Sequence, residues 1–327
     1  RKFVCAQGVE PLIDAPVADT RLGRPGEHLV VEAVCPVTSS QWLLSGHGYS
    51  FIAIRTAEKT ISVRVGCEFR YQVTAPSPAI VQVRPRSDAD HRLLSETWVT
   101  EPRLPLDEYD DVYGNPVRRL LMQPGELVLR YDALCEVPDA VDPDASGAGQ
   151  VGIEELPGEL LHFLLPSRYC LSDDLMDTAW ELFGNTQTGF ARVQAVCDWV
   201  HDNVRFQYGT SNPRTTAVDV FRDRVGVCRD LTHLGVTFCR ALNVPARYVF
   251  GYLPDIEVPV DPAPMDFAAW MEVWLGDRWW TFDPRNNRRR KGRVLIGRGR
   301  DALDVAMMTT YGAATFRTLT VWADPTS

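Results

Sequence analysis

The stretch GVCRDLTHLGVTFCRAL, residues 226 to 242, predicts a helix that carries a cysteine in its first turn. Gly226 lets the backbone turn sharply into the helix, and Cys228 follows two residues later. The free amides and the dipole of a helix N-terminus stabilise negative charge, so this position favours a thiolate nucleophile. The alternative is a small buried thiol without a chemical role. The predicted apolar face comprises Leu231, Leu234, Val236, Phe238 and Leu242.

A second stretch, DFAAWMEVWLGDRWWTFDPRNN at 266 to 287, predicts two antiparallel strands joined by a Gly-Asp turn. Asp283 falls at the end of the second strand, directly before Pro284. A carboxylate at that point can orient an imidazole carried by the neighbouring strand. Such an imidazole would be the base that a cysteine nucleophile requires.

Charge and composition narrow the class of protein. The 327 residues carry a formal net charge of -9, which argues against nucleic acid or an anionic membrane as a general partner. With 45% hydrophobic residues, the chain can build a sizeable core. No apolar run reaches the roughly 18 residues of a membrane span, and no signal-like segment opens the chain. We therefore predict a cytoplasmic protein.

The eight cysteines are scattered and form no CxxC pair, which favours free thiols in a reducing compartment. The sequence contains no HExxH cluster and no paired cysteines, so it does not indicate a zinc site. The segment DPDAS at 142 to 146 is too short to suggest a calcium loop. We therefore predict no metal and no organic cofactor. The oligomeric state stays open.

The pattern along the chain divides it into three regions. Residues 1–58 form an extension of unclear role. Residues 59–150 contain short alternating runs such as ISVRVGCEFRYQV at 61 to 73, which predict an antiparallel β-sandwich. The segment PDAVDPDASGAGQ, 138 to 150, predicts a linker. Residues 151–327 contain helices, the first capped by Ser172, followed by antiparallel strands, which is typical of an α+β domain.

Several ordered motifs give the chain its resemblance to a known family. They are the two stretches above, with PSRYC at 166 to 170, RFQYGTS at 205 to 211, CRALNVPARYVFGYL at 239 to 253 and GRGRDALDVAMMTTYG at 297 to 312. Together they resemble the bacterial transglutaminase-like superfamily, and the β-rich region resembles the transglutaminase N-terminal region. The resemblance covers about residues 60 to 325 and implies a papain-like α+β core, a Cys-bearing helix packed on an antiparallel sheet, preceded by an all-β sandwich.

The resemblance also implies a Cys-His-Asp triad, with Cys228 as nucleophile and Asp283 as the orienting carboxylate. The histidine belongs to a DFHAW motif, but this chain has DFAAW, which places Ala268 at the histidine position. A methyl group cannot accept the thiol proton or pass one to a leaving amine, so we predict very low activity. Two explanations stay open: a deliberate replacement, or a natural member that has lost catalysis.

No other histidine is a good substitute for the missing base. His233 lies five residues after Cys228 and so points about 140° away from it on the helix, which predicts a core residue. His201, in DWVHDNV, is predicted to lie on the surface.

Three further residues are candidates for substrate contact, each with a structural alternative. Tyr208 can approach Cys228 and help to hold an oxyanion, or simply pack. Asp266 can line the cleft or cap the turn into the strand. Trp270 can wall a peptide groove or belong to the core. The basic stretch 285–302 can steer an acidic partner, or form ion pairs with the acidic surface.

The predicted function is thioester chemistry at Cys228 on a peptide or protein that carries an amide. Transamidation, deamidation and proteolysis all remain open, because they differ only in which nucleophile resolves the thioester. The alternative function is a non-catalytic peptide- or protein-binding module.

Overall fold

A computed structural model describes residues 41–43, 52–54 and 59–326 of the chain. The chain divides into two compact units, residues 1–58 and 59–327. In the first unit, β1 (Gln41–Leu43) and β2 (Ile52–Ile54) form an antiparallel pair. The rest of the predicted extension 1–58 lies outside the described residues. Among the described residues, no helix has the length and apolar character needed to cross a bilayer.

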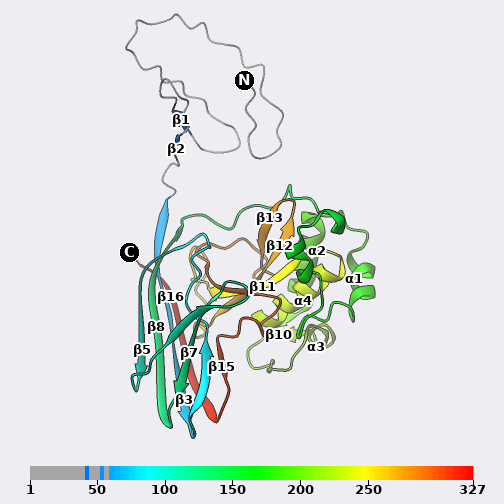
Figure 1. The fold of residues 1–327 in the computed structure, drawn as a ribbon. Coiled ribbons are helices and arrows are strands. Elements are labelled where there is room, and N and C mark those ends of the chain that lie inside the picture. Colours follow the sequence, from blue (N-terminus) through cyan, green and yellow to red (C-terminus); the bar gives the residue numbers. More distant parts are fainter. Residues whose placement is uncertain (1–40, 44–51, 55–58, 327) are drawn as a thin grey trace, which may run out of the picture. The chain divides into compact units, whose positions relative to one another are not determined.

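The second unit begins with a sandwich of two antiparallel sheets, ordered β16-β3-β8-β5 and β15-β4-β7-β6 (Figure 1). Alternate residues of β3 point inward, so its valines and Phe69 are buried while the arginines between them face outward. The strands are β3 (Thr60–Val73), β4 (Ser77–Val81), β5 (Arg92–Glu101), β6 (Asp107–Asp110), β7 (Pro116–Met122), β8 (Gly125–Pro138), β15 (Met308–Thr310) and β16 (Ala314–Thr326).

The last two strands of the sandwich come from the far end of the chain. β15 pairs with β4, and β16 pairs with β3 along nearly its whole length, from Ala314 opposite Val73 to Thr326 opposite Ser62. The predicted boundaries place residues after 151 in the transglutaminase-like region, whereas β15 and β16 lie in the sheets of the sandwich. Sequence alone could not assign them, because a strand pattern does not name its partner strand.

The α+β region is a four-stranded antiparallel sheet, ordered β13-β12-β11-β14, with helices packed on it. The cysteine-bearing helix α4 contacts β11 and β12 directly, and α1, α2 and α3 pack around α4 (Figure 1). The predicted fold class is therefore confirmed. The elements are η1 (Ile153–Glu155), η2 (Gly158–Phe163), α1 (Met176–Phe183), α2 (Phe190–Asn203), β9 (Arg205–Phe206), α3 (Ala217–Asp223), β10 (Val225–Gly226), α4 (Cys228–Ala241), β11 (Ala246–Tyr252), β12 (Ala268–Leu275), β13 (Arg278–Phe282) and β14 (Val294–Gly299).

The start of α1 differs from the prediction. The helix begins at Met176 and not near Ser172, and its N-cap Leu175 offers no capping side chain. Ser172 and Leu175 are both buried, so tertiary packing holds this segment as a turn before the helix starts. Local capping preference is a weaker influence than that burial.

The sandwich and the α+β region share packed side chains. Phe250 and Tyr252 of β11 belong to the same buried cluster as the inward residues of β3 and β8. The hydroxyl of Tyr252 donates a hydrogen bond to the carbonyl of Val83 at 3.0 Å. The predicted linker is also packed in place, because Val141 forms a β-bridge with Lys291. The two regions thus form one packed body.

Candidate functional site

The position of Cys228 is fixed by the first turn of α4. Asp230 is fully buried, and its carboxylate accepts a hydrogen bond from the amide of Val227 at 2.9 Å, which caps the helix. A Cβ on Gly226 would lie 2.8 Å from the Cβ of Asp230, so a larger residue would displace this cap. Ser211 and Arg229 also donate to Asp230. The sequence folds here so that Cys228 opens the helix, as predicted.

The thiol of Cys228 is in its neutral form near neutral pH. The residue is partly exposed, and its Sγ donates to the carbonyl of Phe267 at 3.7 Å. Burial of the thiol group raises its pKa to about 11, although Arg285 and the amides of Ala269 and Arg229 act in the opposite direction. Asp266 raises the pKa further. The lowered pKa expected from the helix N-terminus is wrong for this chain, because desolvation outweighs the amides when no cationic imidazole is present.

Ala268 begins strand β12, next to Phe267, and lines a cavity of about 160 Å³. The other walls near it carry Tyr208, Asp266, Arg285 and Asn286. These polar side chains surround the position at which the resemblance places a histidine. No histidine is among the described residues that line this cavity.

Asp283 follows β13, as predicted, and is buried. Its Oδ1 accepts from the amide of Asn286 at 2.9 Å, and its Oδ2 accepts from Asn286 Nδ2 at 2.8 Å and from Arg293 at 2.9 Å. Phe282 pairs with Met271, so continuing the register places Asp283 opposite Trp270. Side chains two apart share a face of a strand, so Asp283 and Ala268 lie on the same face of the sheet.

Of the three residues predicted to contact the substrate, two line the Ala268 cavity and one lies in the core. Tyr208 is 47% exposed, lines the Ala268 cavity and has its pKa raised mainly by partial burial, with Cys228 among the nearby groups. Asp266 lines the same cavity; its residue surface is exposed, but its carboxyl is desolvated enough to raise its pKa. Trp270 is only 1% exposed and packs with Val249 and Leu295, so it belongs to the core and not to the cavity wall.

The two histidines of the helical region lie where the sequence predicts. His233 is fully buried, stacks between Tyr169 and Tyr248, and accepts a hydrogen bond at Nε2 from the amide of Ala302. Burial holds its pKa well below the usual value, so it is neutral. His201 is exposed, and its Nδ1 donates to the carbonyl of Arg285 at 2.9 Å.

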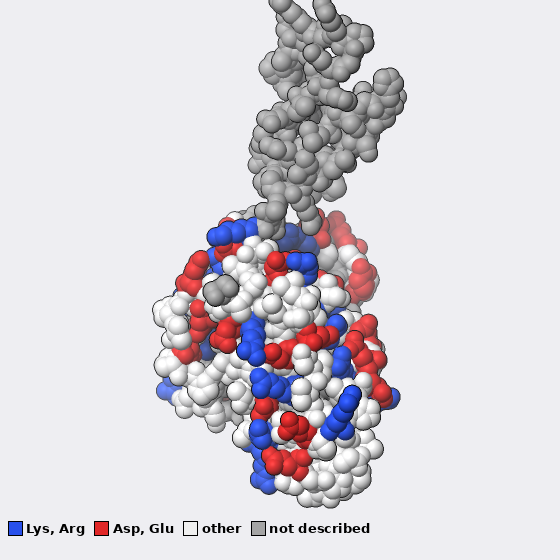
Figure 2. Space-filling view, turned by 90° about the vertical axis from the view of Figure 1, so that its left-hand side faces the viewer, with Lys and Arg blue, Asp and Glu red and all other residues white. Residues whose placement is uncertain are grey.

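The basic stretch 285–302 is largely neutralised within the molecule. Arg290 pairs with Asp255, Lys291 with Asp139 and Glu257, and Arg300 with Asp304. The molecular face in Figure 2, seen from the side of the sandwich, mixes blue and red side chains and shows no broad basic patch. The ion-pair interpretation of this stretch is therefore confirmed, and most of its charge is not available to a partner.

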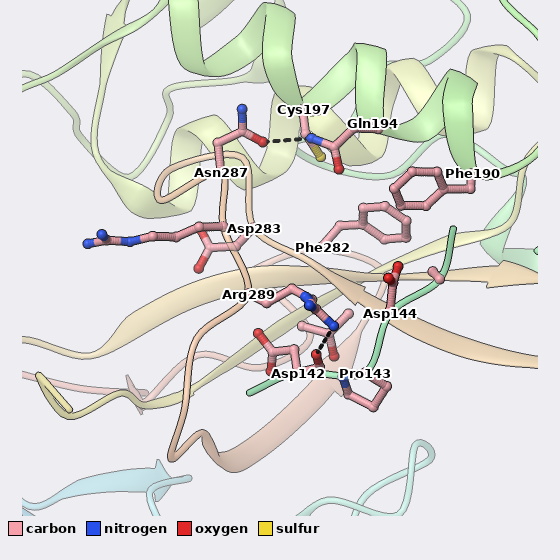
Figure 3. A pocket seen from close by; sticks show the side chains of 13 residues that line it. Asp142, Pro143, Asp144, Phe190, Gln194, Cys197, Phe282, Asp283, Asn287 and Arg289 are labelled. Carbon is pink, nitrogen blue, oxygen red and sulfur yellow. Dashed lines mark hydrogen bonds between the residues drawn. The ribbon is translucent and has the colours of Figure 1, made fainter. Parts of the chain in front are cut away.

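Asp283 lines a second cavity, of about 170 Å³ (Figure 3). Asp142 of the linker and Phe282 of β13 line it, with Phe190 and Gln194 of α2 on the facing wall. Gln194 donates to Asn287 at 2.9 Å across this wall. Asp283 thus lines this second cavity and not the cavity beside Ala268, and its surroundings involve the linker, which the sequence did not indicate.

Metal ligation finds no support in the described part of the chain. Residues 59–326 contain no group of three or more histidine, cysteine, aspartate or glutamate side chains arranged to hold an ion. The six cysteines described there, including Cys228 and Cys197, are free thiols.

Comparisons with known proteins agree with this architecture. Residues 177–284 match the family model of the Transglutaminase-like superfamily. A crystal structure from Cytophaga hutchinsonii, provisionally described as a cysteine protease, superposes with a TM-score of 0.75 at 31% identity, over 82% of this chain and 92% of that one. The chain belongs to the transglutaminase-like superfamily.

Two curated relatives are uncharacterized proteins. One from Mycobacterium leprae is 25% identical over 232 residues, which is 69% of this chain and 82% of the relative. Another, from Mycobacterium tuberculosis strain H37Rv, is 31% identical over 120 residues, or 32% of this chain and 37% of the relative.

Proposed function

We propose that this chain is a scaffold for thioester chemistry on amide bonds and that Ala268 leaves it with very low activity. The observation that carries the proposal is the arrangement of Cys228 at the start of α4, Ala268 beside it on β12, and a buried, hydrogen-bonded Asp283 on the same face as Ala268. The substrate class we propose is a peptide or protein that presents an amide, which the cavity beside Ala268 would receive.

The chemistry requires two proton movements. As the sulfur of Cys228 bonds to the amide carbonyl carbon, a base takes the thiol proton, and the base returns this proton to the departing amine as the carbon–nitrogen bond breaks. An incoming amine or water then gives a proton to the base as it displaces the sulfur, and the sulfur takes that proton back as a thiol. An incoming amine gives transamidation, and water gives deamidation or peptide cleavage. In this chain the thiol has a pKa of about 11 and Ala268 can carry no proton, so the first bond forms only rarely at neutral pH.

Non-catalytic peptide binding is the second candidate. It is favoured by the neutral thiol together with a preserved polar cavity, since Tyr208 and Arg285 remain on its walls. In that case the chain would retain an amide peptide without converting it.

The test is the reaction of Cys228 with iodoacetamide from about pH 5 to pH 9, a range that brackets perturbed thiols. Ala268→His is compared with the unchanged chain by mass spectrometry of the labelled peptide. We expect the variant to label at Cys228 at least about 100-fold faster at pH 6, because an imidazolium would hold the thiolate.

Ala268→Gln is the matched control, since it has a comparable size but no proton-accepting nitrogen. It should label as slowly as the unchanged chain. Equal, slow labelling of all three proteins would contradict the thioester proposal and favour the binding module.

A further inference from the structure

Arg293, the residue before β14, joins two carboxylates that are far apart in the sequence. Its Nε donates to the two oxygens of Asp142 at 3.0 and 2.9 Å, and its terminal nitrogen donates to Oδ2 of Asp283 at 2.9 Å. The guanidinium carbon lies 4.8 Å from the ring centroid of Trp270. Packing and hydrogen bonds thus fix this side chain from several sides.

The three charged groups depend on one another. The side chains of Arg293, Asp142 and Asp283 are only 8%, 11% and 2% exposed. Burial opposes the charge of Arg293, but the two carboxylates outweigh that effect and raise its pKa. Without the guanidinium, two buried carboxylates would face each other across the same region, and like charges in such surroundings repel. Figure 3 shows both carboxylates at the walls of one cavity.

Arg293 also determines which acceptor position of Asp283 stays free. A carboxylate has about four acceptor positions, two on each oxygen. On Asp283, Oδ2 receives two donors, Asn286 Nδ2 and Arg293, while Oδ1 receives only the amide of Asn286. The remaining position is on Oδ1, so Arg293 saturates one oxygen and leaves the other able to orient a further donor.

We propose that Arg293 is a positioning residue for Asp283, and that Asp142 makes the linker between the sandwich and the α+β region part of the site. The proposal rests on the proposed function, because positioning Asp283 matters only if that carboxylate orients a base. Asn286, a neutral partner, would hold Asp283 alone if Arg293 were lost. The carboxylate would then turn away from the linker and present its oxygens differently.

The experiment uses the full chain with Ala268→His and adds Arg293→Met, which keeps the apolar contact with Trp270 but removes the charge. The readout is the pH profile of iodoacetamide labelling at Cys228. We expect labelling at pH 6 to fall by about tenfold or more, because a misplaced orienting group costs this much in comparable sites. The midpoint of the profile should also move upward. Arg293→Lys, which keeps the charge, should recover part of the loss.

Arg298→Met is the matched control, since Arg298 pairs with Glu272 and Asp88 but has no contact with Asp283. It should lower stability without changing the pH profile. Identical profiles for Ala268→His alone and with Arg293→Met, both folded, would overturn the proposal. If Arg293→Met fails to fold, Asp142→Asn replaces it. Asp142→Asn removes the charge of Asp142 while keeping the shape of its side chain. An unchanged pH profile in this variant overturns the proposal as well.

Failure of the proposed function gives a different result. If Ala268→His alone labels no faster than the unchanged chain, the thioester proposal fails. A double-mutant cycle of unfolding with Arg293→Met and Asp283→Asn then reports directly whether Arg293 holds Asp283. A coupling indistinguishable from zero would overturn the positioning role independently of any activity.

Discussion

Two buried carboxylates lie on the same face of the core sheet, and their partners differ. Glu272 of β12 is braced by Arg247 of β11 and Arg298 of β14, so one carboxylate joins three neighbouring strands. Asp283 has a single cation, Arg293, together with Asn286. Burial raises the pKa of Glu272, but the two arginines outweigh it and hold that pKa below the usual range.

The difference separates a structural carboxylate from one suited to chemistry. Both oxygens of Glu272 accept from guanidinium groups, with Arg298 bonding each of them. Asp283 keeps an acceptor position on Oδ1. Oε1 of Glu272, which accepts only from Arg298, keeps one as well, so the difference lies in the cations: two arginines hold Glu272 as a brace between strands, and one arginine holds Asp283. We therefore expect the loss of Glu272 to affect folding most and the loss of Asp283 to affect reactivity most.

The largest effect should follow removal of the brace. Glu272→Ala leaves two partly buried arginines short of their partner and should lower the free energy of unfolding by about 3–5 kcal/mol. Urea denaturation measures this change. Glu126→Ala, which removes an exposed partner of Arg70, is the control and should cost no more than about 1 kcal/mol. If both variants lose a similar amount of free energy of unfolding, Glu272 stabilises the fold no more than a surface ion pair does.

The next effect concerns reactivity. In the Ala268→His background, Asp283→Asn should slow iodoacetamide labelling of Cys228 at pH 6 by about 100-fold, because the imidazolium loses its anionic partner. Glu272→Gln in the same background should leave labelling per folded molecule unchanged. If the two substitutions slow labelling equally, the roles assigned to the two carboxylates are wrong.

The smallest effect needs no substitution. The thiol pKa of the unchanged chain is raised to about 11, so the reactive thiolate is a minor form at neutral pH. Below the pKa, the thiolate share increases about tenfold each time the pH rises by one unit. The rate of labelling should therefore still be rising between pH 9 and pH 10. A short cysteine peptide, the control, levels off near its pKa of about 8.5. If the labelling rate of Cys228 levels off at or below that pH, burial does not dominate the pKa of its thiol.

The sequence predicted the elements that carry the site, because local patterns determine them. Gly226 before an apolar stripe indicated the start of α4, and the alternating aromatic residues around Trp274 indicated β12 and β13. The end of β13 placed Asp283 correctly at a strand terminus. These features depend on neighbours within a few residues, which the sequence displays directly.

The parts that the sequence missed depend on distant partners. Nothing near Asp142 shows that it meets Arg293, about 150 residues later, or that this arginine also holds Asp283. The raised pKa of Cys228 follows from burial under the chain around Phe267, and the helix N-terminus alone suggested the opposite sign. Likewise, tryptophan is a residue type expected in a peptide-binding groove, but Leu295 and Arg293 pack against Trp270 and cover it.

The pairing of β16 with β3 has a consequence for the order in which the protein can assemble during synthesis. β3 leaves the ribosome more than two hundred residues before β16, and every helix of the α+β region is made between them. The nascent sandwich therefore keeps an open strand edge at β3, which is a site for mispairing, until β16 is made. The α+β region can collapse earlier, so the sandwich closes only after the region inserted between its strands has formed.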